Sequence, residues 1–217
     1  TARPYSPTSP FVYGDVSTTT TNATATWTSL AYTANLRAAY VSCGKPVRRL
    51  GVMTRSDVSD YVNAVDFKAQ GGTYHDTGMI WGTRLLSPTG LFATDTAAWP
   101  GRQAPNRYIV FMTDGDMAPN PMIYGMYGLQ AYDGRVASTG TDANGLIPYH
   151  NARFLAECTA AKARNITVFV IGFGQTLTPQ LTQCASPGQA FYASDNASLD
   201  AAFRRIANQV ALLRVSK

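Results

Sequence analysis

Two aspartates that directly follow an apolar stretch are the residues of this sequence best placed for chemistry. Residues 108–112 are apolar, and Thr-Asp-Gly-Asp follows at 113–116. A short apolar run that ends abruptly is typical of a strand buried on both faces of a parallel sheet. In open α/β sheets, ligands bind beyond the carboxyl ends of such strands. We therefore expect Asp114 and Asp116 to bind an ion or take part in catalysis; the alternative is that both only cap a turn.

The elements that would position these carboxylates follow from the alternation of helical and strand patterns after residue 56. Residues 58–68 predict a helix with Ser56 and Asp57 as caps and Gly71-Gly72 at its end. After a loop at 73–77, a second helix is closed by Ser87-Pro88. Further along the chain the patterns predict a helix at 151–164, a buried strand at 166–171, a short helix at 177–184, a strand at 189–193 and a final helix from about residue 198. The fold class is therefore α/β with a largely parallel sheet.

The N-terminal part of the chain differs from the rest. Residues 1–45 are rich in Thr, Ser and Pro, and their aromatic residues are spaced irregularly. We expect an extended segment packed on an α/β domain that spans 46–217, with short strands around 11–16 and 27–32. Residues 117–148 form a long stretch without regular periodicity, which predicts a functional loop.

Composition and charge exclude several classes of protein. The net charge is +5, but no block of Lys and Arg alternates with aromatic residues, so we expect no nucleic-acid partner. No apolar run approaches the roughly 18 residues of a membrane span. The chain begins with Thr1 and shows no signal-peptide pattern, so we expect a processed product or an excised piece of a longer chain, with its targeting sequence and any membrane anchor upstream.

Three stretches together resemble a von Willebrand factor type A domain, specifically the C-terminal part of a TadE/TadG-type pilus assembly protein. They are GGTYHDTGMIWGTRLLSP at 71–88, RYIVFMTDGDM at 107–117, and AECTAAKARNITVFVIGFG at 156–174 with the following LTQCAS and the final helix. The resemblance covers about residues 43–217. It implies a doubly wound, mostly parallel sheet flanked by helices. It also implies a non-enzymatic periplasmic or cell-surface module of a bacterial pilus-assembly or adhesion system that binds a partner protein.

The resemblance further implies a metal-ion-dependent adhesion site that holds Mg²⁺, or Ca²⁺ or Mn²⁺, through oxygen ligands. Thr73 matches the loop that supplies a threonine, and Asp114 matches the loop that supplies an aspartate. Asp116 is a weaker candidate ligand. The family's remaining loop, Asp-x-Ser-x-Ser, has only a poor match in this chain, with Asp15 and Ser17 as its candidate ligands.

That poor match lies too far before residue 73 for the intervening sequence, which lacks the helix and buried strands that the family places there. We therefore expect the first strand of the sheet to lie upstream of Thr1, to remain bound as a fragment of the same precursor, or to be supplied by another chain. A sheet without that strand has unpaired edges, which favours a protein partner or self-assembly.

The chain contains three cysteines. Because proteins of this family are exported, the resemblance implies a disulfide between Cys158 and Cys184, which lie near one end of the strand at 166–171. Cys43 is left over, either to pair with an upstream cysteine or to remain a free thiol.

Both histidines and two tyrosines also call for an interpretation. His75 could line the ion site or form an ordinary hydrogen bond from a loop, while His150 is interpreted as a residue at the start of a helix. Tyr124 and Tyr127 could contact a partner or pack the long loop onto the domain.

The sequence leaves two alternatives to the binding module open. Asp114 and Asp116 after an apolar strand also resemble the haloacid dehalogenase phosphatases, in which the first Asp attacks phosphorus and the second transfers the proton, with Mg²⁺ bound. Ala118 stands where that family has Thr or Val, and the motif lies far from the start of the chain. The other alternative is a structural subunit of a surface polymer.

Overall fold

The computed structural model describes residues 45–64, 67 and 72–215. The chain divides into two compact units: residues 1–72 with 118–149, and residues 73–117 with 150–217. The strands expected at 11–16 and 27–32, the candidate ligands Asp15 and Ser17, and Cys43 lie outside the described residues. Among the described helices, none has both the length and the hydropathy that a membrane span requires.

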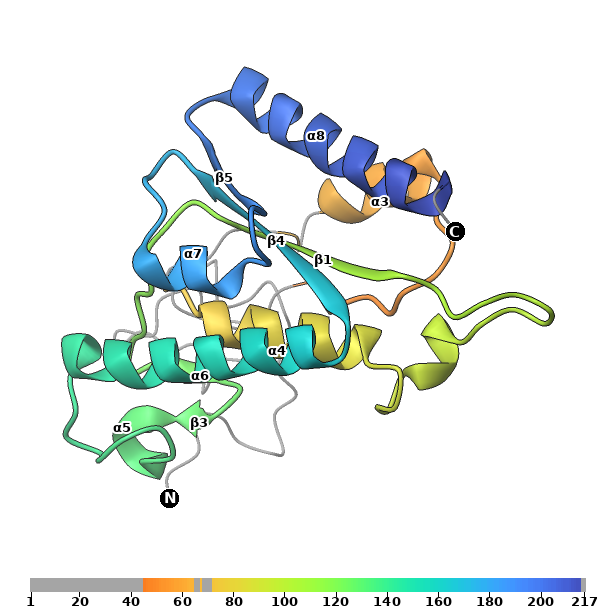
Figure 1. Ribbon diagram of the computed structural model, residues 1–217. Coiled ribbons are helices and arrows are strands. Elements are labelled where there is room, and N and C mark those ends of the chain that lie inside the picture. The colour runs from red at the N-terminus through yellow and green to blue at the C-terminus, as the bar shows by residue number, and fades with distance from the viewer. Residues whose placement is uncertain (1–44, 65–66, 68–71, 216–217) are drawn as a thin grey trace. The chain divides into compact units, whose positions relative to one another are not determined.

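A three-stranded parallel sheet is the centre of the second unit (Figure 1). It is formed by β1 (Arg107–Thr113), β4 (Ile166–Phe173) and β5 (Ala190–Ala193) in the order β1-β4-β5. Arg107 lies beside Ile166 and Val170 lies beside Ala190. This arrangement confirms the three predicted strands, at 108–112, 166–171 and 189–193, and their parallel pairing. A continuous apolar run such as β4 is typical of a strand that is covered on both faces.

One face of the sheet packs against α4 (His75–Leu86) and the C-terminal part of α6 (Ala143–Ala163). A Cβ added to Gly78 would lie 3.5 Å from the ring of Phe111, and one added to Gly82 would lie 3.6 Å from Ile109, so small residues let α4 approach β1 closely. The ring of Phe154 in α6 is 5.2 Å from that of Phe111. The prediction that Ser87 ends α4 is confirmed, but the helix starts at His75, inside the expected loop.

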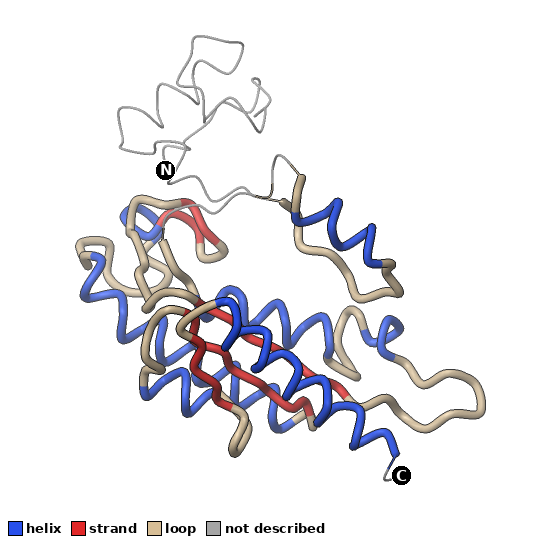
Figure 2. The backbone as a smooth tube through the Cα atoms, turned by 90° about the horizontal axis from the view of Figure 1, so that it is seen from above, coloured by secondary structure: helices blue, strands red, loops and turns tan. Residues whose placement is uncertain are grey.

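The opposite face of the sheet is covered in part by α8 (Asn196–Val215), which lies over β5 and β4 and runs roughly along the strands (Figure 2). Two apolar residues of α8 that lie one helical turn apart pack on four residues of β4 and β5 and form the core beneath this helix. This core consists of Phe169, Ile171, Phe191, Ala193, Ala202 and Ile206. Helices on both faces of a parallel sheet make this unit an α/β layered structure.

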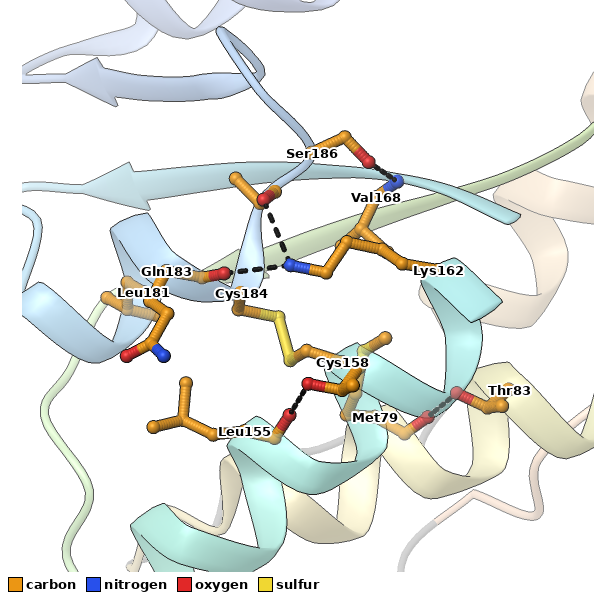
Figure 3. The surroundings of a disulfide bond; sticks show 12 residues. Met79, Thr83, Leu155, Cys158, Lys162, Val168, Leu181, Gln183, Cys184 and Ser186 are labelled. Atoms are coloured by element: carbon orange, nitrogen blue, oxygen red, sulfur yellow. Dashed lines mark hydrogen bonds between the residues drawn. A yellow bond between two sulfur atoms is a disulfide. The ribbon is translucent and has the colours of Figure 1, made fainter. Parts of the chain in front are cut away.

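A disulfide between Cys158 of α6 and Cys184 of α7 (Pro179–Cys184) joins two helices, as Figure 3 shows. Both cysteines are buried. Beside them, Lys162 Nζ donates to the carbonyl of Gln183 (2.9 Å). The start of α7 is also as predicted, because the Thr178 side chain accepts a hydrogen bond from the backbone of Leu181.

The helix α6 corrects one expectation. The sequence predicts a long loop up to residue 148 and a helix from 151, but α6 begins at Ala143 and includes Pro148. Asp142 precedes it, and its carboxylate accepts a hydrogen bond from Gly145 N (2.7 Å). A proline inside a helix removes one backbone hydrogen bond, which is why the pattern favours a later start. His150, expected at a helix start, therefore lies inside α6.

The first unit contains α3 (Arg55–Val62), a hairpin of β2 (Tyr124–Gly125) and β3 (Gly128–Leu129), and the short helix α5 (Gln130–Asp133). The helix α3 starts after Thr54, which forms a capping box with Asp57, and it ends at Val62 instead of continuing to Gly71-Gly72. The expected long loop thus contains regular structure, and Tyr124 and Tyr127 lie in its hairpin.

One further short element, the 3₁₀ helix η2 (Ala93–Thr96), lies in the second unit between α4 and β1. Arg107 ties it to the start of β1, because Nη2 of this side chain donates to the carbonyl of Thr96 (2.8 Å).

Candidate functional site

Two loops that are distant in sequence meet at the C-terminal end of β1. Thr73 lies just before α4, and Asp114-Gly115 directly follows β1. A Cβ added to Gly115 would lie 3.5 Å from Oγ1 of Thr73, which is van der Waals contact. The structure therefore brings the Thr73 hydroxyl next to the loop that carries Asp114, and both side chains belong to the same unit.

His75 holds these two loops together. Its Nε2 atom lies 3.1 Å from the carbonyl oxygen of Gly115 and 3.2 Å from Oγ1 of Thr113. Because a carbonyl oxygen can only accept, Nε2 carries the hydrogen in this arrangement. Thr113 Oγ1 also donates to Gly115 O (2.9 Å). His75 makes its hydrogen bond from the first turn of α4 and not from a loop. The interpretation of His75 as a residue that lines the ion site stays a prediction.

Burial sets the charge state of His75. The residue is only 4 % exposed, and its ring packs against the rings of Phe111 and Phe154. Desolvation lowers the pKa of His75 below 6.5, and the Gly115 carbonyl and the nearby carboxylate of Asp116 only partly oppose this shift. The imidazole is therefore neutral at pH 7.

Behind the loops lies a buried pair formed by Asp76 and His150. The Nδ1 atom of His150 is 2.7 Å from Oδ2 of Asp76, and both side chains are almost completely buried. The other carboxylate oxygen, Oδ1, accepts no hydrogen bond from the described part of the protein. The ring of Tyr74 meets the His150 ring edge to face, with centroids 5.1 Å apart. This pair joins the start of α4 to α6.

The Asp76–His150 pair was not among the residues expected at the site. The two partners are 74 residues apart in sequence, and neither stands in a pattern with metal-ligand or catalytic spacing. The only local signal is an acidic residue in the first turn of α4, which also has a purely helical explanation.

The carboxylates of Asp114 and Asp116 differ from Asp76 because both are exposed. The site thus has an outer layer of oxygen donors, namely a hydroxyl and two carboxylates, and an inner layer of hydrogen-bonded, buried side chains. Within the described residues, no three His, Cys, Asp or Glu side chains converge in a group that could hold a metal ion. Any cation here would depend on the Thr73 hydroxyl, on the two exposed carboxylates and on water.

Such an arrangement can bind a hard cation or a hydrogen-bonding ligand at the end of a parallel strand, where open α/β sheets commonly bind ligands. No protein-family model matches the chain, and no curated protein or solved structure is significantly similar to it.

Proposed function

We propose that this protein is a non-enzymatic binding module of the von Willebrand factor A type, acting in a bacterial pilus-assembly or adhesion system in the periplasm or at the cell surface. It recognises a partner protein through a divalent cation such as Mg²⁺, held by Thr73 and Asp114. The observation that carries this proposal is the meeting of the Thr73 hydroxyl with the Asp114-Gly115 loop. The parallel sheet with helices on both faces supports the doubly wound fold that this function needs.

The chemistry of the donors supports a hard cation. Hydroxyl and carboxylate oxygens suit Mg²⁺, which usually keeps several waters and takes few protein ligands. Two ligands from this chain therefore leave room for water and for a carboxylate of the partner. The His75 ring is turned to the Gly115 carbonyl, so it positions the loop and leaves cation binding to oxygen.

Direct titration with Mn²⁺ tests the cation site, because the free ion gives an electron paramagnetic resonance signal that disappears on binding. We expect one saturable site from which Mg²⁺ displaces Mn²⁺. Asp114→Asn and Thr73→Val should each weaken binding at least tenfold. Asp60→Asn is the matched control, because Asp60 is an exposed carboxylate on α3, and it should leave binding unchanged. Absence of saturable binding, or equal binding by all three variants, would contradict the proposal.

The phosphatase alternative is tested on the same proteins. We expect no hydrolysis of an aryl phosphate in the presence of Mg²⁺. Hydrolysis by the unmodified protein that is lost in Asp114→Asn would replace the binding function with phosphoryl transfer.

A further inference from the structure

The basic side chains of the second unit gather at the end of the sheet where the strands begin. The helix α4 meets the loop after β1 through His75 and Gly115, so it runs antiparallel to β1 and ends beside the start of that strand. The helix α6 leads directly into β4 and therefore ends there too. We call this part of the unit the basic end. Its basic residues are Arg84, Arg102, Arg107, Lys162 and Arg164.

Acidic side chains are concentrated at the other end of the sheet. In the described part of this unit, the acidic residues near the basic end are Asp95 in η2 and Glu157 in α6, and the charges of Arg84 and Arg164 act on Glu157. Three carboxylates at the opposite end are exposed, namely Asp114, Asp116 and Asp195. The charge is thus separated along the strands, and an anionic partner is attracted to the basic end.

Helix dipoles explain only part of this pattern. Basic residues near a helix C-terminus are favourable in any fold. Lys162 and Arg164 fit that explanation, because their side chains donate to backbone carbonyls at the ends of α7 and α6. Arg102 does not, since it is exposed in the loop between η2 and β1. Its charge is available to a partner.

The loop that carries Arg102 contains a tight turn with an exposed tryptophan. Arg102 N donates to Trp99 O (2.9 Å), and Gly101 after Pro100 has a φ of 73°, which is the signature of a type II β-turn. Trp99 is 75 % exposed, and Leu91 before η2 is 91 % exposed. The loop projects beyond the start of β1 in Figure 1 and Figure 2. Since tryptophan is largely buried in most proteins, such exposure points to a partner.

We propose that the basic end binds the surface of a membrane that contains anionic lipids. The basic side chains contact the lipid phosphates, while Trp99 and Leu91 enter the interfacial region. An indole ring suits this region, because its body is apolar and its N–H can donate to a headgroup. Lipid is favoured over nucleic acid or an acidic protein because it receives apolar side chains without a shaped pocket.

This contact goes beyond the proposed cation site and does not depend on it. Thr73 and Asp114 lie at the opposite end of the sheet, where α4 starts and β1 ends. A unit bound to lipid through its basic end therefore presents the cation site away from the membrane, toward a partner protein.

Cosedimentation of the full chain with vesicles tests the membrane contact. We expect binding to vesicles of phosphatidylglycerol mixed with phosphatidylcholine and none to pure phosphatidylcholine, and rising salt should release the protein because it screens the charges. Arg102→Gln should weaken binding about fivefold, which is the contribution of one basic residue near such a surface. Arg204→Gln is the matched control: it removes the same charge from an exposed position midway along α8 and should leave binding nearly unchanged.

Tryptophan fluorescence tests which side chain enters the interface. The chain has three tryptophans, and anionic vesicles should shift their emission to shorter wavelength. The shift should disappear in Trp99→Phe and remain in Trp81→Phe, the control in α4. The proposal would be overturned by a shift that survives in Trp99→Phe, by equal binding to both kinds of vesicle or to neither, or by equal effects of Arg102→Gln and Arg204→Gln. Binding to duplex DNA or to an acidic protein, with none to vesicles, would overturn it as well.

Discussion

At the scale of single residues, the buried Asp76–His150 hydrogen bond is the contact on which the site most depends, because it joins α4 to α6 directly behind the two loops. We expect Asp76→Ala to lower the free energy of unfolding by about 3 kcal/mol, since it removes a buried hydrogen bond together with its carboxylate. Urea denaturation at neutral pH measures this change.

The exposed pair of Asp200 and Arg204 is the matched control for this prediction. Their side chains are 61 % and 76 % exposed, and the two residues are one helical turn apart in α8. Surface ion pairs contribute little because water screens them. Asp200→Ala should therefore leave stability nearly unchanged. A loss as large as that of Asp76→Ala would mean that burial does not determine the strength of the Asp76–His150 contact.

Glu157 in α6 should make the stability of the folded protein depend on pH. Burial raises the pKa of Glu157 above 4.5, although the charges of Arg84 and Arg164 act in the opposite direction. Folding therefore favours the protonated carboxyl, and this stabilisation is lost as the pH rises through the raised pKa. Glu157→Gln should be more stable than the unmodified protein at pH 7 and equally stable near pH 4. A difference that does not change with pH would refute this assignment.

At the scale of elements, the disulfide between α6 and α7 stabilises the second unit by limiting the unfolded chain. Its cysteines are 26 residues apart, and closing a loop of that length contributes about 3 kcal/mol. We expect Cys158→Ser and Cys184→Ser, alone or combined, to lose the same amount, because one bond accounts for the effect. Denaturation of the double variant and of the reduced protein should agree. A double variant markedly less stable than either single variant would point to packing losses instead.

The elements that the sequence predicts well are those with a strong local signal. The strand β4 is a continuous apolar run, α8 repeats apolar residues at helical spacing, and α7 begins with a threonine cap and a proline. The sequence predicts too late a start for α6 because Pro148 interrupts the helical pattern, although Asp142 is a recognisable cap. Local signals thus determine the elements, while tertiary packing decides where their ends lie.

The sequence likewise predicts some residues of the candidate site and not others. The resemblance pointed to Thr73 and Asp114, and the structure places their loops in contact. The positions of His75 and Asp76 follow from packing: one hydrogen-bonds to the Gly115 carbonyl, and the other pairs with a histidine from α6. No spacing along the chain encodes such partners, so sequence reasoning finds the outer ligands and misses the buried side chains that support them.

At the scale of the whole molecule, cation binding at Thr73 and Asp114 should stabilise the folded chain. A ligand that binds the native state and not the unfolded chain shifts the equilibrium toward the native state. We expect Mg²⁺ at 100 times its dissociation constant to raise the free energy of unfolding by about 2.7 kcal/mol.

Two variants with a carboxylate replaced separate the cation site from a general effect of the ion. Asp114→Asn should lose the stabilisation by Mg²⁺ because it removes a proposed ligand, while Asp60→Asn, which removes an exposed carboxylate on α3, should keep it. Thermal unfolding of both variants with and without Mg²⁺ measures the difference. If Asp114→Asn kept the full effect of Mg²⁺, the cation would bind elsewhere on the chain and the site formed by Thr73 and Asp114 would be wrong.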